Sequence, residues 1–206
     1  ITVYAHNQAV MTSEAFMVFP TDALGKNYFI LTYNSDGAMY LGGLSGSSTP
    51  SQFSIVATED DTQVKIIPSA STFKNGQTTQ DIVLDKGEVY LVQAYIGMYF
   101  LYSDLTGTQV ISDKPVAVFA GHQRSVVPFD DYSASSRDCL IEQMLPTSVW
   151  GTSGFIVPFE QVKTDTEYNN DLYRILSAND GTQIFIDSVF AGVLDKGEFL
   201  EREVTE

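Results

Sequence analysis

The sequence contains little cysteine, little histidine and little positive charge. Among its 206 residues there are one cysteine, Cys139, and two histidines, His6 and His122. A single cysteine excludes an intramolecular disulfide in this chain. It leaves the redox compartment undecided, because disulfide-free secreted domains are common once a sizeable core exists. No Asn-x-Ser/Thr sequon occurs, so N-glycosylation of this chain is not expected.

Basic residues are few, and long apolar runs are absent. Only 11 basic residues stand against 26 acidic ones, which gives a formal net charge of −15. A polyanion repels phosphates, so nucleic acid and anionic membrane surfaces are not expected partners. No apolar run approaches the roughly 18 residues of a membrane span, and no basic start followed by an apolar stretch suggests a signal peptide. Direct membrane insertion is therefore not predicted.

Groups for catalysis are also scarce. A Cys-His pair could form from Cys139 and His122, but a lone buried cysteine that packs as a small hydrophobe is the better interpretation. The sequence has no G-x-S-x-G nucleophile motif, and Gly42–Gly46 follows no phosphate-binding pattern. We predict that the chain is not an enzyme and has no catalytic residues, no cofactor and no cofactor-binding residues.

Two acidic clusters, Glu59–Asp61 and Asp130–Asp131, raise the question of calcium. Calcium takes six to eight oxygen ligands, and the spacing of an EF-hand loop is absent. Turns at one edge of a β-structure could still converge on a cation, but solvated turn tips are the simpler interpretation. No metal ligand is predicted, and calcium binding at these turns stays open.

The chain contains an internal repeat, in which one sequence module occurs twice. The hexapeptide Val83–Glu88 recurs unchanged as Val193–Glu198. Three further pairs follow in the same order: Val3–Gln8 with Val118–Gln123, Phe19–Gly25 with Leu145–Gly151, and Ala57–Val64 with Ser177–Ile184. A spacing above a hundred residues is too long for a solenoid or propeller blade. We therefore predict a duplication with units at 1–113 and 114–206, and we interpret the second unit as truncated at its C-terminal end.

Short β-rich runs separated by turn residues recur every eight to twelve positions or so, whereas helical periodicity is hard to find. Apart from a helical turn at Thr147–Trp150, the pattern predicts only strands. They are expected at 15–19, 28–33, 53–57, 64–67, 81–84, 89–92, 108–111, 116–120, 155–157, 173–176 and 183–186. Many short strands without alternating helices predict an all-β fold with two related antiparallel β-sandwich units.

The turns between these runs read as hairpins. In Asn179–Thr182 an Asp-Gly pair lies between two strand-like runs, which is the pattern of a type I′ turn, and Glu59–Thr62 is its counterpart. In Asp85–Glu88 and Asp195–Glu198 the glycine is placed to take a left-handed φ. We expect hairpin turns at all four segments.

Several strings resemble one known family across nearly the whole chain. They are Phe16–Gly25, Phe53–Asp60, Asp104–Thr108, Lys114–His122, Cys139–Pro146 and Trp150–Gly151. These resemble the N-terminal domain family of the IgG Fc-binding protein of mucus. The resemblance implies a secreted or cell-surface β-rich module of the kind attached to mucin-like, adhesive or matrix proteins. That family often carries a second cysteine shortly after the Gly-His pair, and Gln123–Ser125 stands there instead.

The resemblance and the composition together favour a non-enzymatic, structural or adhesive module that is extracellular or at the cell surface. It would take part in matrix, mucus or surface-filament assembly. The expected partners are proteins, including neighbouring copies, adjacent domains of the same protein, and glycoproteins. Exposed strands offer a physical route, because an open strand can pair with one from a neighbour. Ile1–Tyr4 could complete a sheet that an adjacent segment leaves open.

An alternative is a ligand-binding domain that recognises glycans or immunoglobulin through the loops at 34–51 and 124–138. Tyr40, Tyr132 and Tyr168 are the loop aromatics that could stack on sugar rings. Such tyrosines more often cover the edges of loops. No residue motif for immunoglobulin binding can be located in this sequence.

Overall fold

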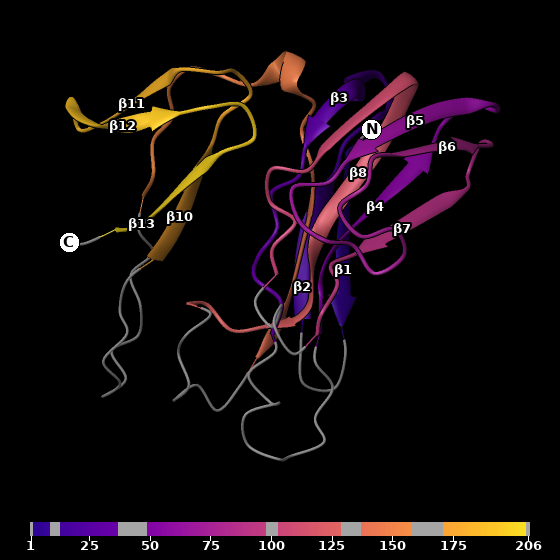
Figure 1. The fold of residues 1–206 in the computed structure, drawn as a ribbon, viewed down its shortest axis with the longest axis horizontal. Coiled ribbons are helices and arrows are strands. Elements are labelled where there is room, and N and C mark those ends of the chain that lie inside the picture. Colours follow the sequence, from indigo (N-terminus) through magenta and orange to yellow (C-terminus); the bar gives the residue numbers. More distant parts are fainter. Residues whose placement is uncertain are drawn as a thin grey trace. The chain divides into compact units, whose positions relative to one another are not determined.

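The computed structural model of the protein describes residues 2–8, 13–36, 49–97, 103–128, 137–157 and 171–204. They form two compact units, unit 1 at Ile1–Val149 and unit 2 at Trp150–Glu206 (Figure 1). The described part of the chain is all-β with antiparallel strands, as predicted, and contains no α-helix. Within it, no helix is long and apolar enough to cross a membrane.

Among the described residues, unit 1 contains nine strands and unit 2 contains four. The strands of unit 1 are β1 (Val3–Gln8), β2 (Ser13–Val18), β3 (Gly25–Phe29), β4 (Ser51–Ala57), β5 (Thr62–Ile67), β6 (Gln80–Leu84), β7 (Val89–Gln93), β8 (Gln109–Ser125) and β9 (Asp138–Gln143). Unit 2 contains β10 (Asp171–Leu176), β11 (Thr182–Ile186), β12 (Val189–Leu194) and β13 (Phe199–Val204). Short 3-10 turns lie at Thr21–Ala23 and Thr147–Val149, and the second confirms the predicted helical turn.

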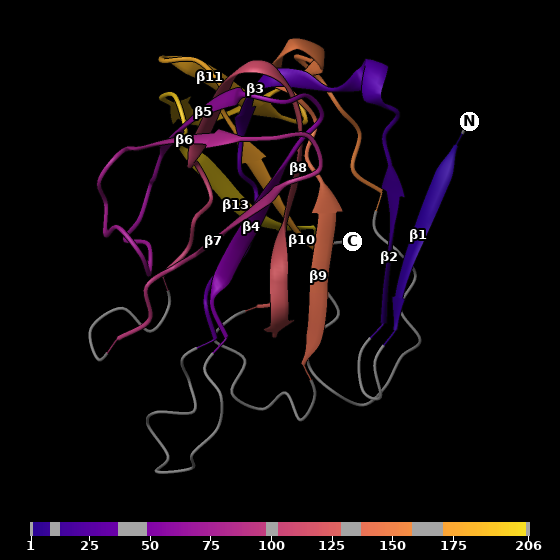
Figure 2. The same cartoon turned by 90° about the vertical axis from the view of Figure 1, so that its right-hand side faces the viewer.

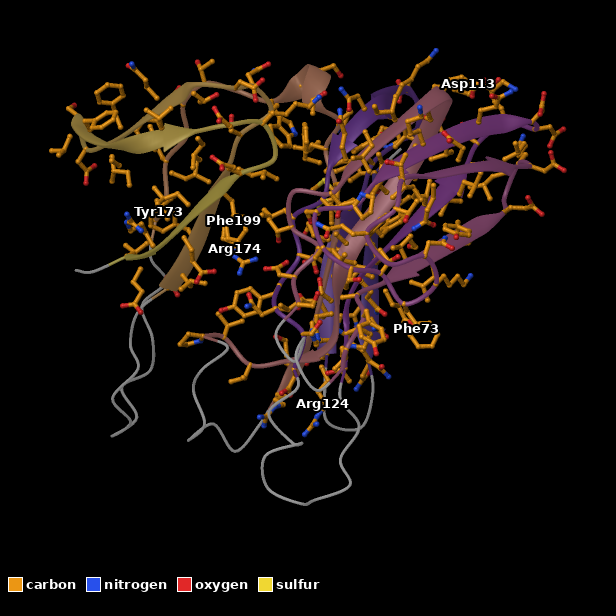
Figure 3. All side chains as sticks on the ribbon, viewed as in Figure 1. Phe73, Asp113, Arg124, Tyr173, Arg174 and Phe199 are labelled. Atoms are coloured by element: carbon orange, nitrogen blue, oxygen red, sulfur yellow. The ribbon has the colours of Figure 1, made fainter. Side chains whose placement is uncertain are left out.

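The long strand β8 organises unit 1. Its first half pairs with β5 on one edge and β3 on the other, and its second half pairs with β4 and β9. The path of paired strands is β6-β5-β8-β4-β7, and β3 and β9 also pair with β8, off this path; Figure 2 shows β9 beside β8. The sequence predicted two strands here, at 108–111 and 116–120. They are one strand that bends at 112–115, where Figure 3 labels Asp113.

Polar contacts hold this bend against the turn that follows β4. The Asp113 carboxylate accepts the Gln63 N–H at 2.8 Å, and Lys114 Nζ donates to the carbonyls of Asp60 and Asp61 at 2.5 and 2.9 Å. The Thr58 hydroxyl donates to the Pro115 carbonyl at 2.6 Å. Both halves of β8 therefore face one core. Its most deeply buried members include Tyr28, Phe53, Ile55, Val64, Ile66, Val110 and Val118.

The predicted hairpins at Glu59–Thr62 and Asp85–Glu88 are wrong in one respect. β4 pairs with β7 and β5 pairs with β6, so neither turn joins two strands that pair with each other. Instead, residues 51–93 form one long hairpin whose two arms both fold at these turns. A turn signal marks where the chain changes direction, but the pairing partners depend on β8, which is distant in sequence.

The two turns of this folded hairpin interlock. The Asp85 carboxylate accepts the Asp61 N–H at 3.0 Å, and the Asp60 carboxylate accepts the Lys86 N–H, also at 3.0 Å. The Gly87 N–H donates to the Ala57 carbonyl with Gly87 at φ +84°, which confirms the predicted left-handed glycine. These reciprocal hydrogen bonds explain why the hexapeptide Val83–Glu88 is the best-preserved segment of the repeat.

Unit 2 contains the same folded hairpin. β10 pairs with β13, and β11 pairs with β12. The Asp195 carboxylate accepts the Gly181 N–H at 2.9 Å, and the Asp180 carboxylate accepts the Lys196 N–H at 3.0 Å. Gly197 has φ +82° and donates to Ser177 as Gly87 does to Ala57. Residues 51–93 and 171–204 therefore match in strand pairing and in turn chemistry.

The two hairpins differ at the tip. In unit 1 the tip spans residues 68–79, and in unit 2 it is Asp187–Ser188 alone. The tip is therefore shorter by ten residues in unit 2. This difference explains why aligned residues are 180 − 60 = 120 positions apart before the tip, at Asp60 and Asp180, and 195 − 85 = 110 positions apart after it, at Asp85 and Asp195. Asp187 and Ser188 have φ of +49° and +67°, as in a type I′ turn. The predicted hairpin at Asn179–Thr182 is thus wrong, because the tight turn lies at Asp187–Ser188.

The strands preceding each hairpin also correspond. β1 pairs with β2 so that Val3 faces Val18. The aligned pair in the second half is Val118 and Met144, and the Met144 N–H donates to the Val118 carbonyl at 2.8 Å. The predicted boundary between residues 113 and 114 falls inside β8. The first half of β8 pairs with β5 and so completes the sheet around the first hairpin. The second half of β8 pairs with β9, as β1 pairs with β2.

One predicted strand is absent. Residues 155–157 have no strand pairing, and Phe155 is 100% exposed. The aligned residues in unit 1 are Phe29–Leu31, at and after the end of β3, and β3 is paired with β8. In the described part of unit 2 no strand takes the place that β8 has beside β3. A strand needs such a partner to satisfy its backbone, so the same sequence pattern stays extended and unpaired.

Candidate interaction surface

The two residues considered for catalysis do not face each other. His122 on β8 lies opposite Leu140 on β9. Because successive side chains of a strand point to opposite faces, Cys139 lies on the other face of the β8–β9 pair from His122. Cys139 is buried and free of disulfide bonding.

His122 is a buried imidazole in a polar neighbourhood. It is 1% exposed, and its Nδ1 accepts the Arg124 N–H at 3.1 Å. Burial lowers the pKa of His122 from 6.5 to about 4, although the charges of Asp36 and Asp104 act in the opposite direction. Its Nε2 finds no hydrogen-bond partner among the described residues. The imidazole is therefore neutral at physiological pH.

The acidic turn Glu59–Asp61 is organised around a lysine. The backbone carbonyls of Asp60 and Asp61 both accept Lys114 Nζ, and the Asp60 carboxylate accepts a backbone N–H. Among the residues that the structure describes, no three His, Cys, Asp or Glu side chains are placed to hold a metal ion. Asp130–Asp131 and the loop tyrosines Tyr40, Tyr132 and Tyr168 lie outside the described residues.

The outer face of the β11–β12 pair is apolar and exposed. We call Phe185, Phe190 and Val193 the apolar face; these side chains are 58%, 57% and 51% exposed. Phe185 lies opposite Phe190, and their rings meet edge-on with centroids 5.7 Å apart. A shift of register next to Phe185 creates this pairing.

The equivalent positions of unit 1 are polar. Lys65 lies opposite Asp81 on the β5–β6 pair, with Nζ 3.8 Å from the carboxylate. Lys65 aligns with Phe185, since Val64 aligns with Ile184. Thus one hairpin presents a solvated ion pair where the other presents two phenylalanine rings. A folded hairpin does not need apolar side chains here, and clustered exposed apolar residues commonly mark an interaction site.

Beside the apolar face, β10 and β13 are joined by Arg174. Its Nε lies 2.6 Å from a Glu201 carboxylate oxygen, and its guanidinium lies 4.6 Å from the centre of the Phe199 ring. Figure 3 shows Arg174 and Phe199 directed toward one another. The Arg174 side chain is only 7% exposed, so these contacts stabilise the β10–β13 pair.

Comparison with known proteins identifies the family. The family model described as IgGFc binding protein matches residues 14–206. The chain belongs to the IgGFc-binding protein family. It is 28% identical over 163 residues to the human protein named IgGFc-binding protein, and the match covers 77% of this chain but 3% of that relative. No solved structure matches the chain significantly.

The resemblance to the IgGFc-binding family that the sequence indicated was confirmed. The apolar face was not predicted from the sequence. Part of the signal was present in the alignment of the two copies, because Lys65 aligns with Phe185, whereas Asp81 aligns with Ala191 and not with Phe190. It was obscured because the register shift at Phe185 determines which residue of β12 opposes it.

Proposed function

We propose that the chain is a non-enzymatic, extracellular structural and adhesive module that takes part in matrix, mucus or surface-filament assembly. It is built from two related β-sandwich units that arose by duplication, with limits near 1–113 and 114–206. Membership of the IgGFc-binding family supports the extracellular binding role. The observation that carries the proposal is the apolar face of β11–β12, where unit 1 has an ion pair.

The partner expected at the apolar face is a protein or the protein core of a glycoprotein. Aromatic side chains contribute large contact areas at protein interfaces and are enriched among their energetically dominant residues. The net charge of −15 opposes binding to polyanions, so apolar contact rather than charge attraction would hold the partner.

A double substitution tests this role by copying unit 1. Phe185→Lys with Phe190→Asp places the unit 1 ion pair at the matched cross-strand position and leaves the strand pairing intact. We expect unchanged folding by circular dichroism and at least tenfold weaker adhesion to immobilised mucin, measured by surface plasmon resonance. Lys65→Ala in unit 1 is the matched control and should leave adhesion unchanged. Equal adhesion of the double variant and the parent chain would refute the role of this face.

The second candidate function is recognition of immunoglobulin, and the name of the human relative, IgGFc-binding protein, favours it. Surface plasmon resonance with IgG Fc immobilised in place of mucin distinguishes the two functions. Binding to Fc that survives the double substitution would place recognition elsewhere on the chain, whereas binding to mucin alone supports the adhesive role.

A further inference from the structure

The tip of the unit 1 hairpin is a structured turn that the folded hairpin does not require. It spans residues 68–79, whereas the tip of the unit 2 hairpin is Asp187–Ser188. The Thr72 backbone N–H and hydroxyl both donate to the Gly76 carbonyl at 2.8 Å, and the Gly76 N–H donates to the Thr72 carbonyl at 3.0 Å. Gly76 has φ +58°, a conformation that glycine adopts without strain. The additional residues of unit 1 therefore form a defined turn of their own.

This turn is held against the edge of β7. The Phe73 N–H donates to the Gln93 carbonyl at 2.9 Å, and the Tyr95 N–H donates to the Ser71 carbonyl at 2.7 Å. The Phe73 side chain nevertheless points into solvent and is 70% exposed (Figure 3). Because its backbone is already fixed, this ring can contact a ligand without any ordering of the loop, which lowers the cost of binding.

A small pocket, open to solvent, lies between this turn and β7, and we call it the tip pocket. It is lined by aromatic, amide and ammonium groups, among them Phe73, Lys74, Gln80, Tyr90 and Gln93. The Tyr90 hydroxyl donates to the Gln80 amide oxygen at 3.1 Å, and the Gln80 amide nitrogen donates to the Thr72 hydroxyl at 3.4 Å. Gln80 is 7% exposed, so these bonds hold the polar wall of the pocket in place.

The polar groups of the tip pocket retain bonding capacity for a ligand. The Gln93 amide nitrogen donates to the Gln52 amide oxygen at 3.0 Å, while the Gln93 amide oxygen accepts no hydrogen bond from the described residues. Lys74 Nζ lies 4.9 Å from the centre of the Tyr90 ring. No carboxylate in the described part of the chain pairs with Lys74, although the chain has 26 acidic residues. An ammonium has three donors and no acceptor, so it favours an anionic group on the ligand.

The second copy shows that the fold does not account for these side chains. The repeat aligns Tyr90 with Leu200. It aligns Gln93 with Glu203. The tip of unit 2 is too short to provide a counterpart of Phe73. Strand pairing is nevertheless the same in both hairpins, so the aromatic and polar groups of the tip pocket are not needed to form it.

We propose that the tip pocket binds an acidic sugar, a monosaccharide ring with a carboxylate, as the terminal unit of a glycan. The Phe73 ring stacks on the C–H face of the sugar, Lys74 pairs with its carboxylate, and the Gln93 amide oxygen accepts a hydroxyl. A sugar uses the ring, the ammonium and the amide together, whereas the carboxylate of an acidic peptide uses only the ammonium. The net charge of −15 does not prevent this contact, because charges farther away than about 8 Å are screened at physiological salt.

Amide NMR of the isotope-labelled chain, titrated with N-acetylneuraminic acid at physiological salt, tests the proposal. The backbone amides of Phe73 and Lys74 and the side-chain amide of Gln93 should shift as the sugar is added. Irradiation of the aromatic protons of the protein should transfer saturation to the protons of the sugar, because the Phe73 ring lies against it. The methyl ester of the same sugar, which lacks the charge, should bind at least about tenfold more weakly.

Substitutions of exposed side chains make the result specific. Phe73→Ala removes the stacking surface, and Lys74→Gln removes the charge but keeps a long side chain; each should weaken binding of the acid at least about tenfold. Lys74→Gln should leave binding of the methyl ester unchanged. Phe185→Ala and Lys65→Gln are matched controls, because these exposed side chains line no part of the tip pocket, and both should bind the acid as the parent chain does.

Equal affinity for the acid and its methyl ester, or binding that survives Phe73→Ala or Lys74→Gln, would overturn the proposal. An absence of shifts with the acid would also overturn it, and shifts with a glutamate-rich peptide in its place would identify an acidic protein segment as the ligand. This inference goes beyond the proposed adhesive role. The Phe185→Lys/Phe190→Asp variant leaves the tip pocket intact, so sugar binding and adhesion through the apolar face fail or succeed separately.

Discussion

At the scale of single residues, the environment of His122 could not be predicted from the sequence. The sequence marked it only as a weak partner for Cys139, and nothing in the one-dimensional pattern showed that the two side chains point to opposite faces. The structure shows a neutral imidazole, 1% exposed, in the interior of unit 1. The neutral state of this buried imidazole therefore bears on the stability of unit 1.

The lowered pKa of His122 predicts a pH-dependent loss of stability. The pKa is about 4 in the folded protein and 6.5 as the reference for the unfolded chain, so the unfolded state binds the proton first. The stabilisation is complete above pH 6.5 and is lost as the pH falls toward 4, with a total of about 3 kcal/mol. Urea denaturation of the parent chain and of His122→Gln at pH 7.0 and 4.5 measures it.

We expect the gap in unfolding free energy between parent and His122→Gln to narrow by about 2 to 3 kcal/mol between these two pH values. The carboxylates of the chain titrate in both proteins, so their contribution cancels in this difference. A gap that stays the same at both pH values would show that His122 does not titrate on unfolding.

At the scale of elements, the tip of the unit 2 hairpin gives a direct prediction. Ser188 holds φ at +67°, which costs a residue with a Cβ atom more than it costs glycine. Ser188→Gly should therefore raise the free energy of unfolding of unit 2 by about 0.5 to 1 kcal/mol, because Asp-Gly suits a type I′ turn. Thermal denaturation of this variant beside Ser153→Gly, outside any turn with positive φ, measures the effect. A lower melting temperature for Ser188→Gly would contradict the turn assignment.

The same elements show how far the sequence could predict the fold. The glycine positions of the turns, Gly87 and Gly197, were predicted correctly, because a left-handed φ depends on the local residue type. The all-β class and most strands were also predicted from local patterns. The pairing was not, because β4 and β5 are brought together by β8, some fifty residues away. The tip at Asp187–Ser188 was missed because it lacks glycine.

At the scale of the whole molecule, comparison of the two copies locates the candidate surface. The hairpins at residues 51–93 and 171–204 match in strand pairing. The first presents the Lys65–Asp81 ion pair where the second presents Phe185 and Phe190. The net charge of −15 opposes the approach of anionic partners at low ionic strength, so adhesion is best measured near 0.15 M salt.

The central claim is that the apolar face of the β11–β12 pair is the surface through which the chain adheres. Surface plasmon resonance on immobilised mucin, with the parent chain and the Phe185→Lys/Phe190→Asp double variant side by side, measures this directly. The account predicts at least tenfold weaker adhesion of the double variant, with an unchanged circular dichroism spectrum. Equal adhesion of the two proteins would contradict it.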